Sequence, residues 1–139
     1  MDYENELFWY DGLKDGGTFP VDETTAEAIK DNPDQLKGKV VTLTIGNYMV
    51  GYGSAGDDPL GYVRSVEPIS GNKHNLCAAV VFNSSFMFVP ADASAAPKSY
   101  GACDGKGGIQ KAATPTSTRI WATGKDMDDN DVCTVYIHG

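Results

Sequence analysis

Two segments, one rich in glycine and one rich in acidic residues, have residue spacings that could support ligand or metal binding. The first matches a dinucleotide-binding pattern. Gly51–Gly56 fits G-x-G-x-x-G after a strand-like run. A dinucleotide site needs a helix that begins at the third glycine, because the N-terminus of that helix holds the pyrophosphate. Here Asp57, Asp58 and Pro59 follow, which places two negative charges where phosphate would lie. The segment is therefore predicted to be a glycine-rich turn, and no nucleotide cofactor is expected.

The second segment, residues 126–131, has the acid spacing of the start of a calcium-binding loop. An EF-hand loop needs glycine at its sixth position and a bidentate glutamate at its twelfth, where this chain has Asp131 and Ile137. An EF-hand is therefore excluded. Several oxygen ligands still lie close together and form a looser calcium candidate: Asp126, Asp128 and Asn130. The alternative is a solvated hairpin turn without a metal.

The remaining groups with catalytic potential are isolated in the sequence. His74 and His138 each lack a second histidine or cysteine at metal-ligand spacing, and no G-x-S-x-G elbow occurs. The three cysteines are widely spaced and odd in number, which argues against a disulfide framework. Of these, Cys77 and Cys133 lie in apolar runs and are predicted to be small buried hydrophobes. We expect no enzyme and no cofactor, although carboxylate pairs of the glycosidase type stay open because acids are abundant.

Acidic side chains are concentrated at the start of the chain. Residues 1–34 carry ten acids and two bases while residues 35–139 balance at zero, so the first segment accounts for the whole net charge of −8. A negative chain without a basic face argues against nucleic-acid binding. We therefore divide the chain into an acidic arm, residues 1–34, and a near-neutral domain, residues 35–139. The arm is either a solvated leader or a docking segment, since it contains four large apolar side chains: Leu7, Phe8, Trp9 and Tyr10.

The pattern of apolar residues predicts the elements that carry these groups. A chain of 139 residues with a hydrophobic fraction of 41% suits one domain with one core. Thr24 as a cap, with Glu27 three residues later, predicts a short helix in the arm. After residue 39 the apolar period changes to two, and in the last such segment Cys133, Val135 and Ile137 are predicted to face the core.

About eight short strands separated by turn signals predict an all-β fold, either a small β-barrel or a β-sandwich. The arm with its short helix precedes these strands. We see no internal repeat in the sequence, and no apolar run is long enough to span a membrane.

Four aromatic residues of the predicted strands offer a second class of function. They could form a stacking platform for a carbohydrate or a cell surface: Tyr48, Tyr52, Tyr62 and Trp121. Their alternate spacing is equally expected for the wall of a barrel, which is the interpretation we favour.

The domain resembles the small capsid decoration, or cement, proteins of tailed bacteriophages. The resemblance rests on six motifs that recur in order: Leu36–Leu43, Gly56–Val63, Cys77–Val81, Asp104–Ile109, Arg119–Ala122 and Val132–Ile137. Each motif alone consists mostly of residues that are typical of turns. The resemblance therefore rests on the order of the six motifs over about 100 residues. The arm, residues 1–34, is not part of this pattern, and the stretch 83–99 is longer than the pattern leads us to expect.

The resemblance implies a β-barrel or β-tulip fold, assembly into homotrimers and no catalysis. Such proteins lie on the outer surface of the virion, where they clamp neighbouring subunits of the major capsid protein. The implied partners are therefore the major capsid protein and further copies of this chain, with neither nucleic acid nor a membrane. The aromatic run at residues 7–10 is the predicted contact with the shell, because buried aromatic side chains dominate interface energies.

Overall fold

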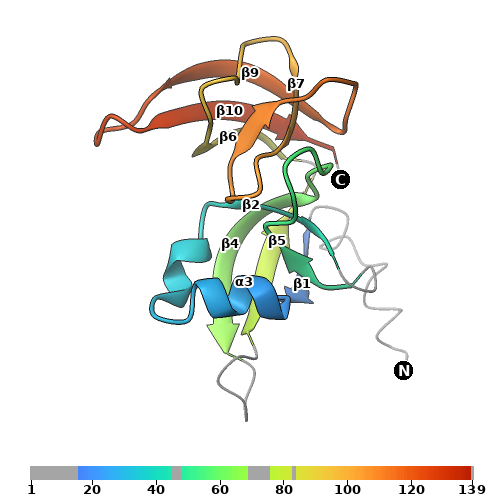
Figure 1. Ribbon diagram of the computed structural model, residues 1–139, viewed down its shortest axis with the longest axis vertical. Coiled ribbons are helices and arrows are strands. Elements are labelled where there is room, and N and C mark those ends of the chain that lie inside the picture. The colour runs from blue at the N-terminus through green and yellow to red at the C-terminus, as the bar shows by residue number, and fades with distance from the viewer. Residues whose placement is uncertain (1–15, 45–47, 69–75, 83, 139) are drawn as a thin grey trace.

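The computed structural model describes residues 16–44, 48–68, 76–82 and 84–138, with the backbone alone described for 84–87. Within these residues the chain forms ten strands in two antiparallel five-strand sheets, with one short α-helix and one 3-10 helix near the start (Figure 1). The predicted all-β fold with a short N-terminal helix is confirmed. The number of strands exceeds eight because short segments without apolar alternation also pair.

The two sheets follow each other along the chain. The first has the order β1-β5-β4-β2-β3 and the second the order β6-β10-β9-β7-β8. The strands of the first sheet are β1 (Gly16–Pro20), β2 (Val40–Leu43), β3 (Val50–Gly51), β4 (Gly61–Pro68) and β5 (Leu76–Val81). Those of the second are β6 (Ser84–Pro90), β7 (Tyr100–Cys103), β8 (Ile109–Lys111), β9 (Thr118–Lys125) and β10 (Asp131–Ile137). In β10 the predicted core residues Cys133, Val135 and Ile137 are all buried.

The helix α3 (Glu23–Ala28) lies where the sequence predicts one, but the predicted cap, Thr24, is wrong. Asp22 is the N-cap, because its backbone is extended and its Oδ1 accepts a hydrogen bond of 2.8 Å from Thr25 N. Aspartate ranks above threonine as an N-cap, and its charge also interacts favourably with the helix dipole. The 3-10 helix η1 (Pro33–Leu36) follows and leads into β2.

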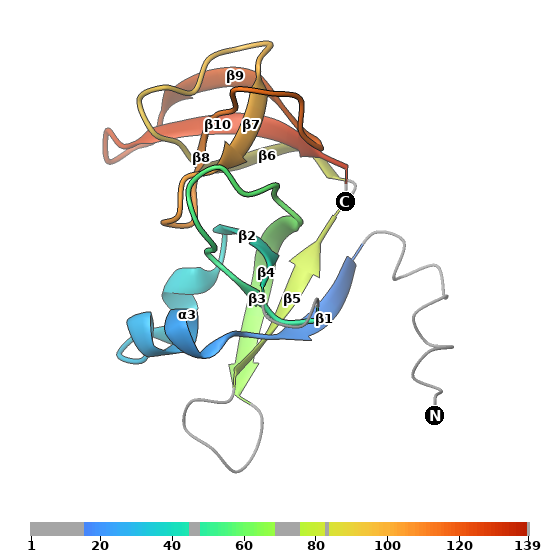
Figure 2. The ribbon, with the colours of Figure 1, turned by 45° about the vertical axis from the view of Figure 1, so that its right-hand side comes forward.

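The two sheets have the same topology, although the sequence itself shows no internal repeat. In each sheet the first strand of that half lies at one edge, beside the fifth, which is followed by the fourth, second and third strands (Figure 2). Each sheet is also closed by a parallel bridge formed directly after the proline that ends its first strand. These bridges are Val21 to Val50 in the first half and Ala91 to Ile109 in the second.

Hydrogen bonds outside the strand ladders recur at matching positions. Asp22 N donates to Val50 O at 2.9 Å, and Asp92 N donates to Ile109 O at the same distance. The strand registers agree as well, because β4 and β9 each carry a β-bulge at their fourth residue, Arg64 and Trp121, opposite the fifth strand. We therefore describe the chain as two halves, residues 16–82 and 84–138, that share one topology.

One matching position has different residues in the two halves. Gly38 N donates to Val63 O at 2.8 Å with φ at 81°, and Lys98 N donates to Ile120 O at 2.7 Å with φ at 66°. A left-handed conformation costs a residue with a Cβ about 1–2 kcal/mol, and glycine avoids this strain.

We therefore expect Lys98→Gly to raise the free energy of unfolding by up to about 1 kcal/mol, since the added flexibility of the unfolded chain offsets part of the relieved strain. Gly38→Ala should lower it by about 1 kcal/mol, because an added Cβ meets no atom within 4 Å and only the backbone strain counts. Urea unfolding curves of the two variants measure both changes. The two variants should change the free energy of unfolding in opposite directions. A loss of stability in Lys98→Gly would contradict the matched geometry of the two positions.

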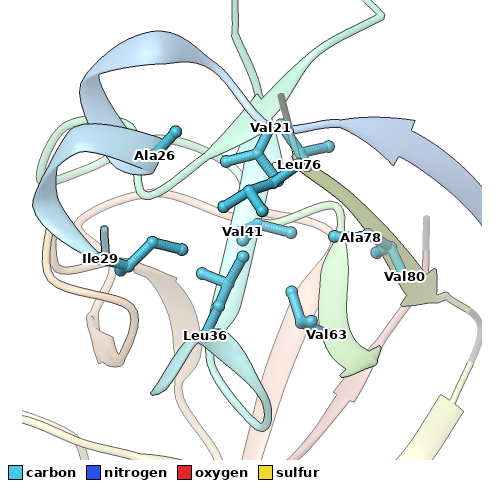
Figure 3. Close-up of a cluster of buried hydrophobic side chains, with 10 residues drawn as sticks. Val21, Ala26, Ile29, Leu36, Val41, Val63, Leu76, Ala78 and Val80 are labelled. Carbon is cyan, nitrogen blue, oxygen red and sulfur yellow. The ribbon is translucent and has the colours of Figure 1, made fainter. Parts of the chain in front are cut away.

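Each half has its own hydrophobic cluster, and the two clusters are linked. The first packs α3 and η1 against the first sheet, with Ala26, Ile29 and Leu36 facing the strand residues (Figure 3). The described part of the predicted arm, residues 16–34, is thus packed into the first half. The second cluster consists mainly of residues from the second sheet. It also contains Val40 from β2 and contacts Tyr62 from β4.

Candidate functional site

The loop before β4 and the turn between β7 and β8 meet at the junction of the two halves. Cys103 N donates to Asp57 O and Gly56 N donates to Cys103 O, both at 2.8 Å. Asp58 Oδ1 accepts hydrogen bonds from Ser117 N at 3.1 Å and Ser117 Oγ at 2.7 Å. These bonds tie the first half to β7 and to the start of β9. We name these contacts the junction.

The turn between β7 and β8 completes the junction. Asp104 Oδ1 accepts from Lys106 N at 2.7 Å and from Gly108 N at 2.9 Å, which holds the turn closed. Gly107 has φ at 91° and its carbonyl accepts from Val40 N at 2.8 Å. A Cβ on Gly107 would lie 2.9 Å from the Tyr52 ring, so glycine is required for this close approach. The hydrogen bond from Val40 to Gly107 therefore joins two of the six motifs that carry the resemblance, Leu36–Leu43 and Asp104–Ile109.

In the segment Gly51–Gly56, Gly51 ends the strand β3 and the residues after it form the predicted turn, which lies beside the junction. Asp57 Oδ2 accepts from Ser54 N at 2.8 Å, and the chain then enters the strand β4 rather than a helix. A pyrophosphate would need helix N–H groups at this point, so the segment has a structural role.

The candidate calcium ligands all belong to the β9–β10 hairpin turn. Asp126 Oδ1 accepts from Asn130 N at 2.8 Å and from Asp128 N at 2.9 Å. The backbone hydrogen bond from Asn130 is the main cause that lowers the pKa of Asp126. Among the described residues, no group of three or more His, Cys, Asp or Glu side chains could hold a metal ion. The Asp126 carboxylate therefore organises the turn.

All three cysteines are free thiols, and the two buried ones lie in a setting that suppresses reactivity. Cys103 and Cys133 are buried and Cys77 is half-buried. Burial raises the pKa of Cys103 to about 12, with a further contribution from the carboxylates of Asp57, Asp104 and Asp58, and burial alone raises the pKa of Cys133 to about 12. Since the thiolate is the nucleophile, neither buried thiol is poised for catalysis at neutral pH.

The four aromatic residues proposed as a stacking platform have different environments. Tyr52 packs against the first cluster and Tyr62 against the second, and burial raises the pKa of Tyr52. Tyr48 and Trp121 are exposed, but they belong to different halves. Among the described residues, the ring contacts join other pairs, Phe19 with Phe82 and Tyr136 with His138.

The predicted shell-contact residues Leu7, Phe8, Trp9 and Tyr10 lie outside the described residues, as does His74. No helix in the described part of the chain is long and apolar enough to cross a membrane.

Sequence reasoning missed two exposed apolar residues of the second half. Phe88 in β6 is 74% exposed, and Met127 in the hairpin turn is fully exposed. Together with Val132 they line a surface hollow of about 400 Å³, and Trp121 of the same half is also half-exposed. The available signal was that β6 has apolar residues at successive positions, Phe88 and Val89, which a strand turns to opposite faces.

Comparisons with protein-family models, with curated proteins and with solved structures found no match for this chain.

Proposed function

We propose that this chain is a structural protein of a bacteriophage particle that binds the outer surface of an icosahedral head. It stabilises the shell by clamping neighbouring subunits of the major capsid protein. The observation that carries the proposal is the ordered series of motifs along residues 36–137, two of which meet at the junction. A rigid body held by such contacts suits a passive clip better than a catalyst.

Assembly on the shell follows from symmetry and avidity. Binding of one contact raises the effective concentration of the others, so several weak contacts in a symmetric homotrimer bind tightly together. In this proposal the aromatic run Leu7–Tyr10 supplies a contact from each copy. The acidic residues around it keep the free protein soluble.

The test first asks whether a major capsid protein gene lies beside the gene of this chain, and it then uses shells assembled from that capsid protein. The wild-type chain should occupy these shells in sedimentation, and Phe8→Ala with Trp9→Ala should lower its affinity by about tenfold or more, the loss typical of aromatic hot spots. Tyr48→Ala is the matched control, because Tyr48 is an exposed aromatic residue outside the run. Absence of wild-type binding overturns the function, whereas unchanged binding of the double variant removes only the aromatic run from the mechanism.

A carbohydrate-binding module is the second candidate, favoured by the exposure of Trp121 and Tyr48. In that case the pure protein binds specific sugars on a glycan array, and Trp121→Ala abolishes the signal. An array without signal, together with shell binding, supports the capsid function.

A further inference from the structure

Because the two halves share one topology, a comparison of their matching positions shows which residues the fold needs and which it does not. Phe88 in β6 pairs with Thr134 in β10, just as Thr18 in β1 pairs with Ala79 in β5. The same strand position therefore holds threonine in one half and an exposed phenylalanine in the other. At the matching β-bulges the first half has an arginine where the second has the exposed Trp121. The topology forms without aromatic residues at either position.

Phe88 and Trp121 lie on the two strands that flank β10 in the second sheet, and both side chains are exposed. Phe88, Thr134 and Ala122 are paired in line across β6, β10 and β9, and Trp121 precedes Ala122. With neighbouring strands about 4.8 Å apart, the Phe88 and Trp121 backbones are separated by about 10 Å. The hollow beside Phe88 is lined also by Met127 and Val132. We name the outer patch as Phe88, Met127 and Val132, which line one hollow, together with the exposed Trp121 on the far side of β10, and apolar groups gathered on a surface in this way mark interaction surfaces.

Negative charge borders the outer patch at its hairpin end. The hairpin carries four aspartates and one lysine between residues 125 and 131. Lys125 Nζ pairs with Asp131 at 2.9 Å, which neutralises one of them. Three carboxylates, including those of Asp128 and Asp129, therefore keep a net negative field beside the apolar surface.

This field discriminates between occupants. Residues 1–15 of the chain contain five acids and one base, and in a second copy too the whole net charge of −8 lies in residues 1–34. The acidic arm of this chain or of a second copy would therefore bring like charge to the hairpin, which costs free energy across an interface. A surface with lysine or arginine around apolar side chains is complementary in both charge and polarity.

We propose that the outer patch docks a polypeptide partner whose apolar side chains are flanked by lysine or arginine. The apolar groups cover Phe88, Trp121 and Met127, and the basic groups face Asp128 and Asp129. The inference does not rest on the proposed function, because it is drawn from residues outside the predicted shell contact and predicts the chemistry of any protein partner.

The test is selection of a random peptide display library on the immobilised full chain. Selected peptides should be enriched in lysine or arginine next to apolar residues. Synthetic copies of these peptides should bind the double variant Phe88→Ser with Met127→Ser about tenfold more weakly than they bind the wild-type chain. Their binding to the wild-type chain should weaken as the salt concentration rises. Since both side chains are exposed, the double variant should fold normally, which a thermal melt checks. Leu43→Ser with Tyr48→Ser is the matched control, because it removes two exposed apolar residues of the first half.

A second variant tests the charge independently of the apolar contact. Asp128→Asn with Asp129→Asn should weaken the binding of the same peptides several-fold. The control Asp31→Asn with Asp34→Asn, which removes two exposed carboxylates of the first half, should leave their binding unchanged. The proposal is overturned if no peptide is selected, if the selected peptides lack basic residues, or if the Phe88 and Met127 variant binds them unchanged. It is also overturned if sedimentation shows a wild-type oligomer that this variant abolishes, because the occupant is then a second copy.

Discussion

Replacing Ile120 by alanine is expected to lower the free energy of unfolding by about 3 kcal/mol, through lost burial and the cavity left behind. Ile120 in β9 is fully buried in the second cluster, which also contains Val40 from the first half. Because this cluster and the junction link the halves, the loss should destabilise both together. Urea unfolding should give one transition, and hydrogen exchange of the β4 and β5 amides should speed up with that of β9 and β10.

The control for this prediction is Ile120→Val, which removes one methyl group and should cost only about 1 kcal/mol. Val63→Ala at the matching position of β4 should accelerate exchange in β9 and β10 in return. If Ile120→Ala leaves exchange in β4 and β5 unchanged, the halves unfold independently and the link through Val40 is too weak to couple them.

The parts of the fold that follow from sequence are those where side-chain period and burial agree. β10 alternates buried and partly exposed residues along its length, so its inward face could be predicted. β1 could not, because its two glycines and its proline disfavour a strand and only Thr18 and Phe19 favour one, so it pairs because β5 offers an edge. The shared topology could not be predicted from the sequence, because strands pair through their backbones. Matching positions can therefore hold residues as different as Leu76 and Asp131.

The candidate site was harder to predict than the fold, because exposure depends on which way a strand faces. Tyr52 and Tyr62 pack against the clusters while Trp121 is exposed, although all three occur in strand-like sequence. For Trp121 the decisive feature is the β-bulge, which breaks the alternation and turns an extra residue outward. Met127 is exposed because a tight turn closed by Asp126 presents it to solvent.

The second large effect is expected from pH. Raising the pH from 7 to 10 should lower the free energy of unfolding by about 3 kcal/mol through the two buried thiols. Burial raises the pKa of Cys103 and of Cys133 from 9.0 to about 12, so both stay protonated in the folded protein at pH 10. In the unfolded chain they ionise near their ordinary value. Their contribution is thus complete below pH 9 and is lost as the pH rises towards 12.

Urea unfolding at pH 7, 8, 9 and 10 measures this loss, and the comparison is made within each variant. Cys103→Ala with Cys133→Ala is less stable at pH 7 because two core side chains are truncated, but its stability should fall much less between pH 7 and pH 10. Cys77→Ala is the matched control, because it removes the half-buried thiol and leaves both buried ones in place. Its stability should fall with pH as steeply as that of the wild type. An equally steep fall in the double variant would assign the alkaline loss to other groups, since thiols that are absent cannot ionise.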